Sequence, residues 1–471
     1  MRTTNPYRKL LSDTFLFPVS TFGSKILTFL LTPFYTHILS EAEYGVTDLL
    51  IQTGNLLIPI VSMGILNGVM RFGLDKGPDP RSIFTTGLIV ILLGNLILAL
   101  CLPLFQYIGI SWDYAVLLLL YVMMANLHSL CGMFSQILGR IRLFALSGIL
   151  CTGIAVCCNI LLLAVLRMGV TGYILANVMA DAVSAVVLFF AAGLGRFIRL
   201  SQIQGKLAKQ MFQYCLPLVP VTVCAWIINI SDRYFISYLI GAAATGLYAV
   251  ANKIGSILSI ASGIFTSAWQ LSAAEDRSKE ERAHFFTNVF SVYEAGTLIL
   301  ASLLSLVSPF LMRFLAAPGY FEAWRYAPVL LLSTALSCLS SFFSSVYVTE
   351  KRSVAALLTA LAGALVNLVG NSLLIPLWGM MGAAVATCAS YLALFFARAF
   401  HSRTLIRIQW NIPRFIFSIA AMVLQCVMIE YGHAVWAYIC AAGVAVLHIR
   451  PIQKALRSGL IQSLQPKRSA K

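Results

Sequence analysis

The sequence predicts an all-α protein that crosses a membrane many times, with about 14 transmembrane helices. Hydrophobic residues make up 59% of the 471 positions, charged residues make up 11%, and the mean hydropathy is +0.87. Soluble domains carry about 25% charged residues, so this chain has too few polar side chains to cover a surface in water. Long apolar runs recur from one end to the other, and basic residues gather in alternate gaps between them.

Fourteen apolar runs approach or exceed the length that crosses a bilayer, which is about 20 residues of helix. Charged residues, glycines and prolines separate them. The first run is long and further runs follow it, which is not typical of a cleavable signal peptide. The predicted spans are residues 11–37, 44–70, 82–107, 113–138, 143–166, 170–194, 210–231, 243–270, 285–311, 326–348, 353–376, 380–400, 412–430 and 433–449.

The positions of Lys and Arg predict how the chain is oriented. With the N-terminus in the cytoplasm, 27 basic residues fall in inside segments and four in outside segments, while Lys25 and Lys253 fall within spans. Cytoplasmic segments of membrane proteins carry such an excess of basic residues. Membrane topology therefore explains the net charge of +16 without a nucleic-acid partner, and we expect both termini in the cytoplasm.

An internal repeat divides the chain into two similar halves. Glycines of the second half follow those of the first at offsets of 201 and 210 residues. The pairs are Gly45 and Gly54 with Gly246 and Gly255, and Gly169 and Gly172 with Gly379 and Gly382. The repeat predicts two parallel six-helix lobes, an arrangement typical of alternating-access transporters, plus two extra C-terminal helices. The predicted domains are an N-lobe at 1–195, a cytoplasmic basic linker at 196–209, a C-lobe at 210–402, helices 13 and 14 at 403–450, and a basic cytoplasmic tail at 451–471.

Three local motifs resemble one family of membrane proteins. They are the Tyr44-Gly45 corner, Asp232-Arg233 followed by Thr245 to Lys253, and the stretch from Asn371 through Pro376 and Gly379 to Ala386. Together they resemble the bacterial polysaccharide-biosynthesis flippases, in the superfamily that includes multidrug-and-toxin exporters and lipid II flippases. The resemblance implies a plasma-membrane protein that moves undecaprenyl-(pyro)phosphate-linked oligosaccharide from the inner to the outer leaflet. It also implies membrane lipids, H⁺ or Na⁺, a glycan polymerase and glycosyltransferases as partners.

Charged residues inside the spans are the candidate functional groups, because each costs at least ~2.5–3.5 kcal/mol to insert at the bilayer centre. Asp48, Asp232 and Arg233 lie nearer the outer ends of their spans. We expect Lys25, Lys253 and Arg233 to bind the anionic phosphate of the substrate. We expect Asp181 and Glu294 to carry a coupling ion, and Asp48, His128 and Asp232 to join them in coupling or line the cavity. The alternatives are structural: Lys253 snorkels to the interface, Lys25 pairs with a carboxylate, and Asp232-Arg233 is a local ion pair at a helix end. Asp181 and Glu294 would then be static partners of buried polar groups, and His128 a hydrogen-bonded core residue.

Neither an enzyme nor a cofactor is predicted. The 11 cysteines lie mostly in apolar runs without a C-x-x-C pair, so we expect no metal site and no disulfide. The chain lacks G-x-x-x-x-G-K-[ST], G-x-S-x-G and H-E-x-x-H, so ATP does not drive transport on this chain. The longest outer loop, about 312–325, is short for a glycan polymerase.

A second hypothesis is an ion-coupled multidrug antiporter with the same fold. Its cationic cargo would need a net acidic cavity, whereas Lys25 and Lys253 favour an anionic cargo. Glycosyltransferase genes beside this one would favour the flippase.

Overall fold

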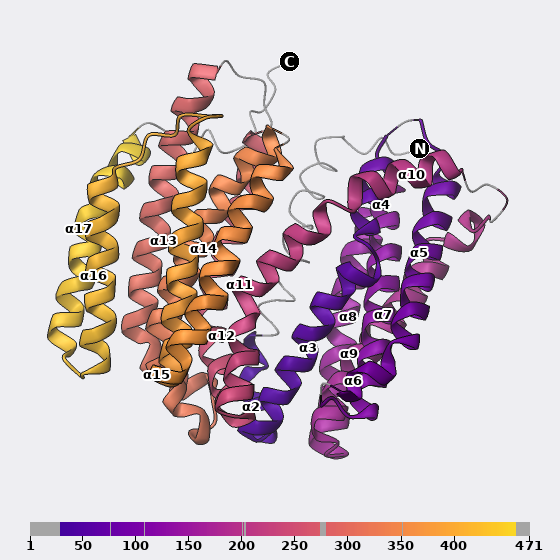
Figure 1. Cartoon of the computed structure of the whole chain (residues 1–471), viewed down its shortest axis with the longest axis horizontal. Coiled ribbons are helices and arrows are strands. Elements are labelled where there is room, and N and C mark those ends of the chain that lie inside the picture. The colour runs from indigo at the N-terminus through magenta and orange to yellow at the C-terminus, as the bar shows by residue number, and fades with distance from the viewer. Residues whose placement is uncertain are drawn as a thin grey trace, which may run out of the picture. The chain divides into compact units, whose positions relative to one another are not determined.

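The computed structural model describes residues 29–75, 77–107, 109–199, 201, 204–273, 279–350 and 352–457, and all regular elements in those ranges are helical (Figure 1). Contacts divide the chain into two compact units, Met1–Val223 and Cys224–Lys471. The predicted all-α fold is confirmed. The limits of the predicted domains stay predictions.

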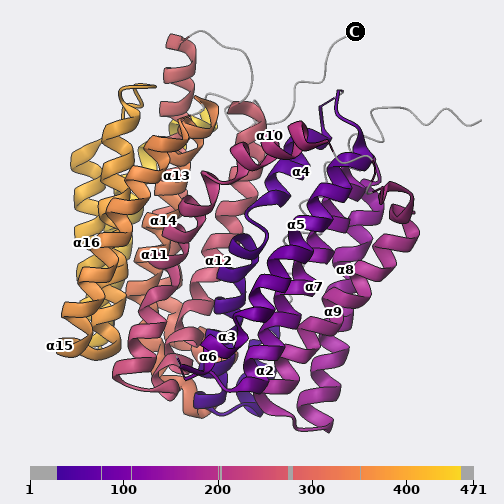
Figure 2. The same cartoon turned by 45° about the vertical axis from the view of Figure 1, so that its right-hand side comes forward.

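In the first unit, α7 is the central helix, because it packs against α3, α4, α5, α8 and α9 (Figure 2). Phe84, Phe134 and Leu188 form part of its buried core. The elements are α2 (Thr32–Ile38), α3 (Glu41–Val61), α4 (Ile65–Gly73), α5 (Pro80–Leu100), α6 (Leu102–Tyr107), α7 (Trp112–Ile137), α8 (Ile141–Asn159), the π-helix η1 (Ile160–Val165), α9 (Gly169–Ala191), the 3₁₀ helix η2 (Leu194–Phe197) and α10 (Gly205–Cys215).

In the second unit, α14 packs against α12, α13, α15 and α16, and the last two helices pair with each other beside α13 (Figure 1). Stacked aromatic rings, such as Phe395 on Phe415, join α15 to α16. The elements are α11 (Leu218–Leu239), which begins in the first unit, α12 (Ala242–Ala273), α13 (Lys279–Leu315), the 3₁₀ helix η4 (Pro318–Arg325), α14 (Ala327–Thr349), α15 (Ser353–Ser402), α16 (Ile412–Glu430) and α17 (Ala434–Arg457).

The predicted count of 14 spans is recovered when the bent pair α3–α4 counts as one span, the long helix Val354–Ser402 as two, and the predicted first span is added. Among the described residues, 11 helices are long and apolar enough to cross a membrane, or up to 12 when the bent pair α3–α4 counts as one span. One of the 11 covers Val354–Ser402, where the sequence predicts two spans, and it has a non-helical residue at Gly379. Most of the predicted first span, 11–37, lies outside the described residues. The fold is therefore that of a polytopic membrane protein with about 14 spans.

The predicted span at 44–70 is not one straight helix. It is broken into α3 and α4, which meet at 55°. Pro59 lacks an N–H group, and Met63 and Gly64 then take positive φ values of 47° and 65°, which an α-helix cannot continue through. The prediction of one helix rested on the hydropathy of the run, which masked this proline–glycine signal.

The predicted span at 210–231 also differs. The structure continues α11 to Leu239, so Asp232 and Arg233 lie inside the helix and not at its end. Both residues are buried, at 2% and 8% exposure. The prediction that this pair lies at a helix end is therefore wrong. Hydrogen-bond donors on other helices satisfy the Asp232 carboxylate, so the helix can continue past it.

The repeated glycines occupy matching positions in the two units. Gly169 begins α9 with φ +54°, and Gly379 breaks α15 with φ +59°. Three residues later, a Cβ atom on Gly172 would lie 3.2 Å from the carbonyl oxygen of Leu162, and one on Gly382 would lie 2.1 Å from that of Leu374. In both units the second glycine therefore allows a close approach of two backbones, as small residues do between membrane helices.

We expect Gly382→Ala to lower the yield and thermal stability of the folded protein. The added methyl group would meet a backbone carbonyl, which no rotamer change can move away, and overpacking costs about 1–3 kcal/mol. Gly443→Ala in α17 is the matched control, because its Cβ would meet no atom within 4 Å. Fluorescence-detected size exclusion after heating measures both variants. Equal melting of the two variants would contradict the close backbone approach.

Candidate functional site

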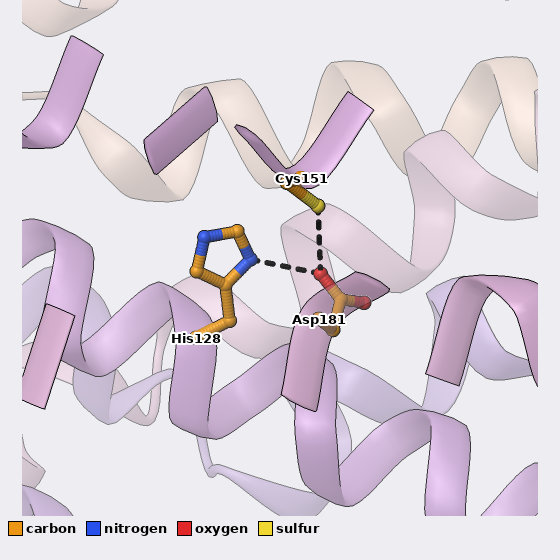
Figure 3. Close-up of side chains that lie close together, drawn as sticks. All are labelled: His128, Cys151 and Asp181. Carbon is orange, nitrogen blue, oxygen red and sulfur yellow. Dashed lines mark hydrogen bonds and ion pairs between the residues drawn. The ribbon is translucent and has the colours of Figure 1, made fainter. Parts of the chain in front are cut away.

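In the first unit, three helices bring polar side chains together near their midpoints. Nδ1 of His128 on α7 lies 2.8 Å from Oδ1 of Asp181 on α9. The Cys151 thiol on α8 donates to the same carboxylate oxygen at 3.6 Å (Figure 3). The His128 and Asp181 side chains are each 19% exposed. The structure therefore unites two of the predicted residues and adds a cysteine to them.

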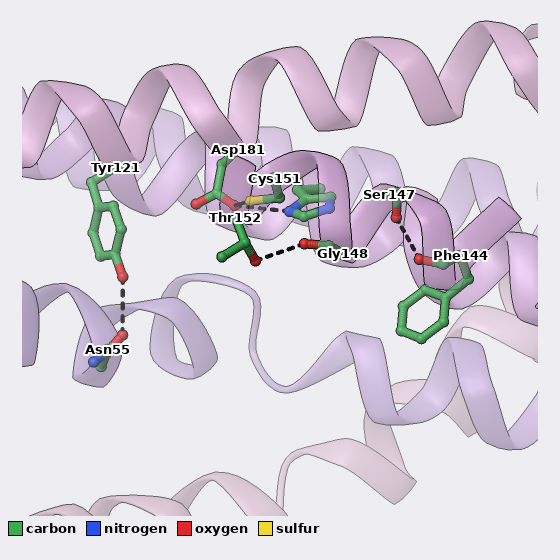
Figure 4. Close-up of polar contacts among 9 residues, drawn as sticks. Asn55, Tyr121, Phe144, Ser147, Gly148, Cys151, Thr152 and Asp181 are labelled. Atoms are coloured by element: carbon green, nitrogen blue, oxygen red, sulfur yellow. Dashed lines mark hydrogen bonds and ion pairs between the residues drawn. The ribbon is translucent and has the colours of Figure 1, made fainter. Parts of the chain in front are cut away.

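Further polar groups lie beside this cluster. The Tyr121 hydroxyl donates to Oδ1 of Asn55 at 3.2 Å, which joins α7 to α3 (Figure 4). The hydroxyl of Thr152, next to Cys151 in α8, donates a hydrogen bond to the carbonyl oxygen of Gly148 in the same helix. Asn55 is exposed, so polar side chains extend from the half-buried Asp181 toward a surface of the first unit.

In the second unit, Asp232 is held by neutral donors. Its Oδ2 accepts hydrogen bonds from the Tyr248 hydroxyl at 2.7 Å and from the Thr387 hydroxyl at 3.2 Å. Its Oδ1 accepts from the backbone N–H of Arg233 at 2.8 Å. These donors come from α11, α12 and α15. Hydrogen bonds of this kind stabilise a buried carboxylate, so Asp232 holds three helices together.

A chain of amides and hydroxyls continues from Asp232. The Ser231 hydroxyl donates to Asn367 Oδ1 at 2.6 Å, and Asn371 donates to the same oxygen at 3.0 Å. Asn367 in turn donates to Thr387 and Ser390. All of these residues are buried. The result is a polar network inside the second unit that links α11 to both halves of α15.

Glu294 has a charged partner that comes from a segment predicted to be cytoplasmic. Arg414, the third residue of α16, donates to Glu294 Oε2 at 2.7 Å and to Ser291 at 3.3 Å. The Glu294 side chain is fully buried and that of Arg414 is 15% exposed. The pair joins α13 to α16, so an ion pair holds one of the two extra C-terminal helices to α13.

The predicted cationic residues have different surroundings. Lys253 lies midway along the candidate span Ala242–Thr266 and is partly buried, and within the described ranges its ammonium group has no ion-pair partner. Arg233 is buried in the second unit beside Asp232. Asp48 lies in α3, half-buried. Lys25 lies outside the described residues, so its role stays a prediction.

Sequence reasoning missed Cys151, Tyr248, Thr387 and Arg414 as members of these groups. Cys151 is 23 residues from His128 and 30 from Asp181, so no local spacing connects the three. The signal available in the sequence was position along the span, because His128, Cys151 and Asp181 all lie near the middle of adjacent spans. Depth does not show which way a side chain points around its helix.

The helices and buried charges define a polytopic membrane protein with polar groups held inside its spans. A family profile described as "Polysaccharide biosynthesis protein" matches residues 10–270, which is more than half of the chain. The chain belongs to this family. The resemblance noted in the sequence is therefore confirmed at the level of the family.

Solved structures show a similar fold. The lipid II flippase MurJ in an inward closed conformation aligns with a TM-score of 0.69 at 13% identity, covering 95% of this chain and 100% of that one. A multidrug resistance MATE family transporter of the MOP superfamily aligns in its outward-facing form, with a TM-score of 0.58, 13% identity and coverage of 83% and 94%. A MATE family transporter of the same superfamily in an inward-facing form aligns with a TM-score of 0.59 at 12% identity, covering 82% of this chain and 94% of that one. No curated protein sequence matches this chain.

Proposed function

We propose that this protein is a flippase for undecaprenyl-(pyro)phosphate-linked oligosaccharide. It moves this lipid from the inner to the outer leaflet of the plasma membrane by alternating access, for the assembly of a surface polysaccharide. It transports and does not catalyse, and a glycan polymerase and glycosyltransferases of the same pathway use and supply its substrate. The family and the fold shared with a lipid II flippase support this proposal.

The position and surroundings of Lys253 are the observation that favours an anionic cargo. A cation at mid-span is costly, and a structural role would normally supply it with a carboxylate. Within the described ranges no carboxylate lies within ion-pair distance of Lys253. A phosphate or diphosphate on the cargo would supply the missing charge and accept charge-assisted hydrogen bonds.

The second candidate, an ion-coupled drug antiporter, draws on the likeness to multidrug transporters. A cationic drug needs an available carboxylate. Three buried or partly buried carboxylates in the described spans already have partners: Asp181 has His128, Asp232 has Tyr248 and Thr387, and Glu294 has Arg414. Their engagement favours the anionic lipid over the cationic drug.

Reconstitution in proteoliposomes tests the proposed cargo. A fluorescent polyprenyl-diphosphate oligosaccharide is placed in both leaflets, and a membrane-impermeant glycosidase removes the outer sugar. Flipping raises the fraction digested above the half that is accessible in protein-free vesicles. A cationic dye in the same vesicles is the second arm. Export of the dye without digestion of the protected lipid would replace the flippase with the antiporter.

The same vesicles test the predicted coupling residues. If Asp181 or Glu294 carries H⁺ or Na⁺, then Asp181→Asn or Glu294→Gln should abolish the response to an ion gradient while substrate binding stays measurable. The reason is that the neutral amide can no longer bind the ion that shifts the conformational equilibrium. An unchanged pH and Na⁺ response in both variants would remove these carboxylates from coupling.

Cysteine labelling tests the proposed orientation. Cysteines introduced at 205–209 should be protected from an impermeant maleimide in intact cells, and cysteines at 318–324 should react. The expectation follows from the 27 basic residues in predicted inside segments against four in outside segments. Lysed cells provide the control, because both sites should then react. External labelling at 205–209 would reverse the orientation.

A further inference from the structure

The proposed lipid cargo does not explain the cluster of side chains on α7, α8 and α9. It gathers an imidazole, a thiol and a carboxylate, one from each helix (Figure 3). One ligand atom from each of His128, Cys151 and Asp181 lies within 4.8 Å of the others. These are the three side-chain types that bind zinc most often in proteins.

We propose that His128, Cys151 and Asp181 form a binding site for a divalent transition-metal ion of the zinc class. Imidazole and thiolate favour such ions, whereas Na⁺, Mg²⁺ and Ca²⁺ favour sites made of oxygen ligands alone. The mixed donor set therefore selects the class of metal. The site replaces the expectation of no metal, which rested on the local spacing of cysteines. The proposal is independent of the cargo and of the direction of transport.

Two of the three distances between ligand atoms lie near those of a zinc site, and all three ligand atoms lie within 4.8 Å of one another. Zinc lies about 2.0–2.3 Å from nitrogen, oxygen and sulfur ligands, so tetrahedral ligand atoms are about 3.3–3.6 Å apart. Cys151 Sγ is 3.6 Å from Asp181 Oδ1, and His128 Nδ1 is 2.8 Å from the same oxygen. The histidine nitrogen and the aspartate oxygen must separate by about 0.5 Å to take the ion between them.

Three protein ligands leave one coordination position for a water molecule. The partial exposure of His128 and Asp181, at 19% each, is consistent with such access. On binding, the thiol proton of Cys151 goes to solvent. The proton between His128 Nδ1 and Asp181 moves to Nε2 or to solvent, so that Nδ1 coordinates as neutral imidazole. Affinity therefore rises with pH, since metal and protons compete.

A metal here would tie three helices of the first unit together at mid-depth. It would also occupy the Asp181 carboxylate and exclude that residue from carrying a coupling ion. The transport assay and the metal assay can thus fail separately, because one follows the lipid and the other follows the ion.

The test uses purified full-length protein stripped with a chelator and titrated with Co²⁺, which reports thiolate ligation by a near-ultraviolet charge-transfer band. We expect about one ion per chain with this band. The band should be lost in Cys151→Ser, and affinity should fall at least tenfold in His128→Ala and Asp181→Asn. Cys157→Ser is the matched control, because Cys157 lies on the same helix, is exposed and belongs to no such cluster among the described residues.

A second measurement needs no variant that could misfold. Zn²⁺ should slow alkylation of Cys151 in the wild-type protein, followed by peptide mass spectrometry, and leave Cys157 unaffected, while Mg²⁺ protects neither. Absence of the cobalt band in the wild-type protein, its persistence in Cys151→Ser, or equal alkylation of Cys151 with and without Zn²⁺ would overturn the site.

Discussion

Arg414→Met should lower the thermal stability of the purified protein strongly, by more than Gly382→Ala does. The change leaves the Glu294 carboxylate fully buried and without its cation. Breaking a buried ion pair from one side costs about 3–5 kcal/mol, because the remaining charge keeps its desolvation penalty and loses its partner. Glu294 Oε1 has no hydrogen-bond partner among the described residues, so little else there would compensate.

The double variant Glu294→Gln with Arg414→Met separates the charge effect from the loss of packing. It removes both charges, so it should recover most of the stability that Arg414→Met loses. Arg71→Met is the matched control. Its partner Asp75 forms an exposed pair, with side chains 58% and 47% exposed, and such pairs contribute about 0–1 kcal/mol. Strictly additive losses in the double variant would show that Glu294 and Arg414 do not depend on each other.

Lys253→Ala should abolish or strongly reduce export of the lipid-linked oligosaccharide while the protein stays folded in the membrane. Each charge-assisted contact contributes about 1.5–3 kcal/mol, so the loss of one should weaken substrate binding by about one to two decades. Folding should survive, because within the described ranges the ammonium group has no carboxylate to leave unpaired. Lys25→Ala should behave in the same way.

The conservative variants and the control make this result specific. Lys253→Arg should keep part of the export that Lys253→Ala loses, since a diphosphate on a flexible lipid can bind either an ammonium or a guanidinium group. Lys206→Ala removes an exposed cation in α10, outside the proposed site, and should leave export unchanged. Full export by the Lys25→Ala, Lys253→Ala double variant would rule out the proposed phosphate contact. Loss of folded protein in both single variants would assign the lysines to structural pairs.

The sequence was enough for the fold class and for the repeat. Apolar runs of span length are visible in one dimension, and the bilayer imposes their length on every helix alike. The glycine pairs at offsets of 201 and 210 were also visible. Gly382 lies against the Leu374 carbonyl as Gly172 lies against that of Leu162. The proline and glycine that break α3 from α4 were present as well, and the hydropathy of the run concealed them.

The sequence could also say that Asp181, Glu294 and Lys253 lie within spans, because depth follows from position along a span. It placed Asp232 at the end of a span, and only the structure showed that the helix continues past it. Only the tertiary structure decided their partners. Arg414 reaches Glu294 from 120 residues away, Thr387 reaches Asp232 from 155, and Cys151 reaches Asp181 from 30. The physical reason is that a partner depends on the rotation of each helix about its axis, and close packing against several neighbours fixes that rotation.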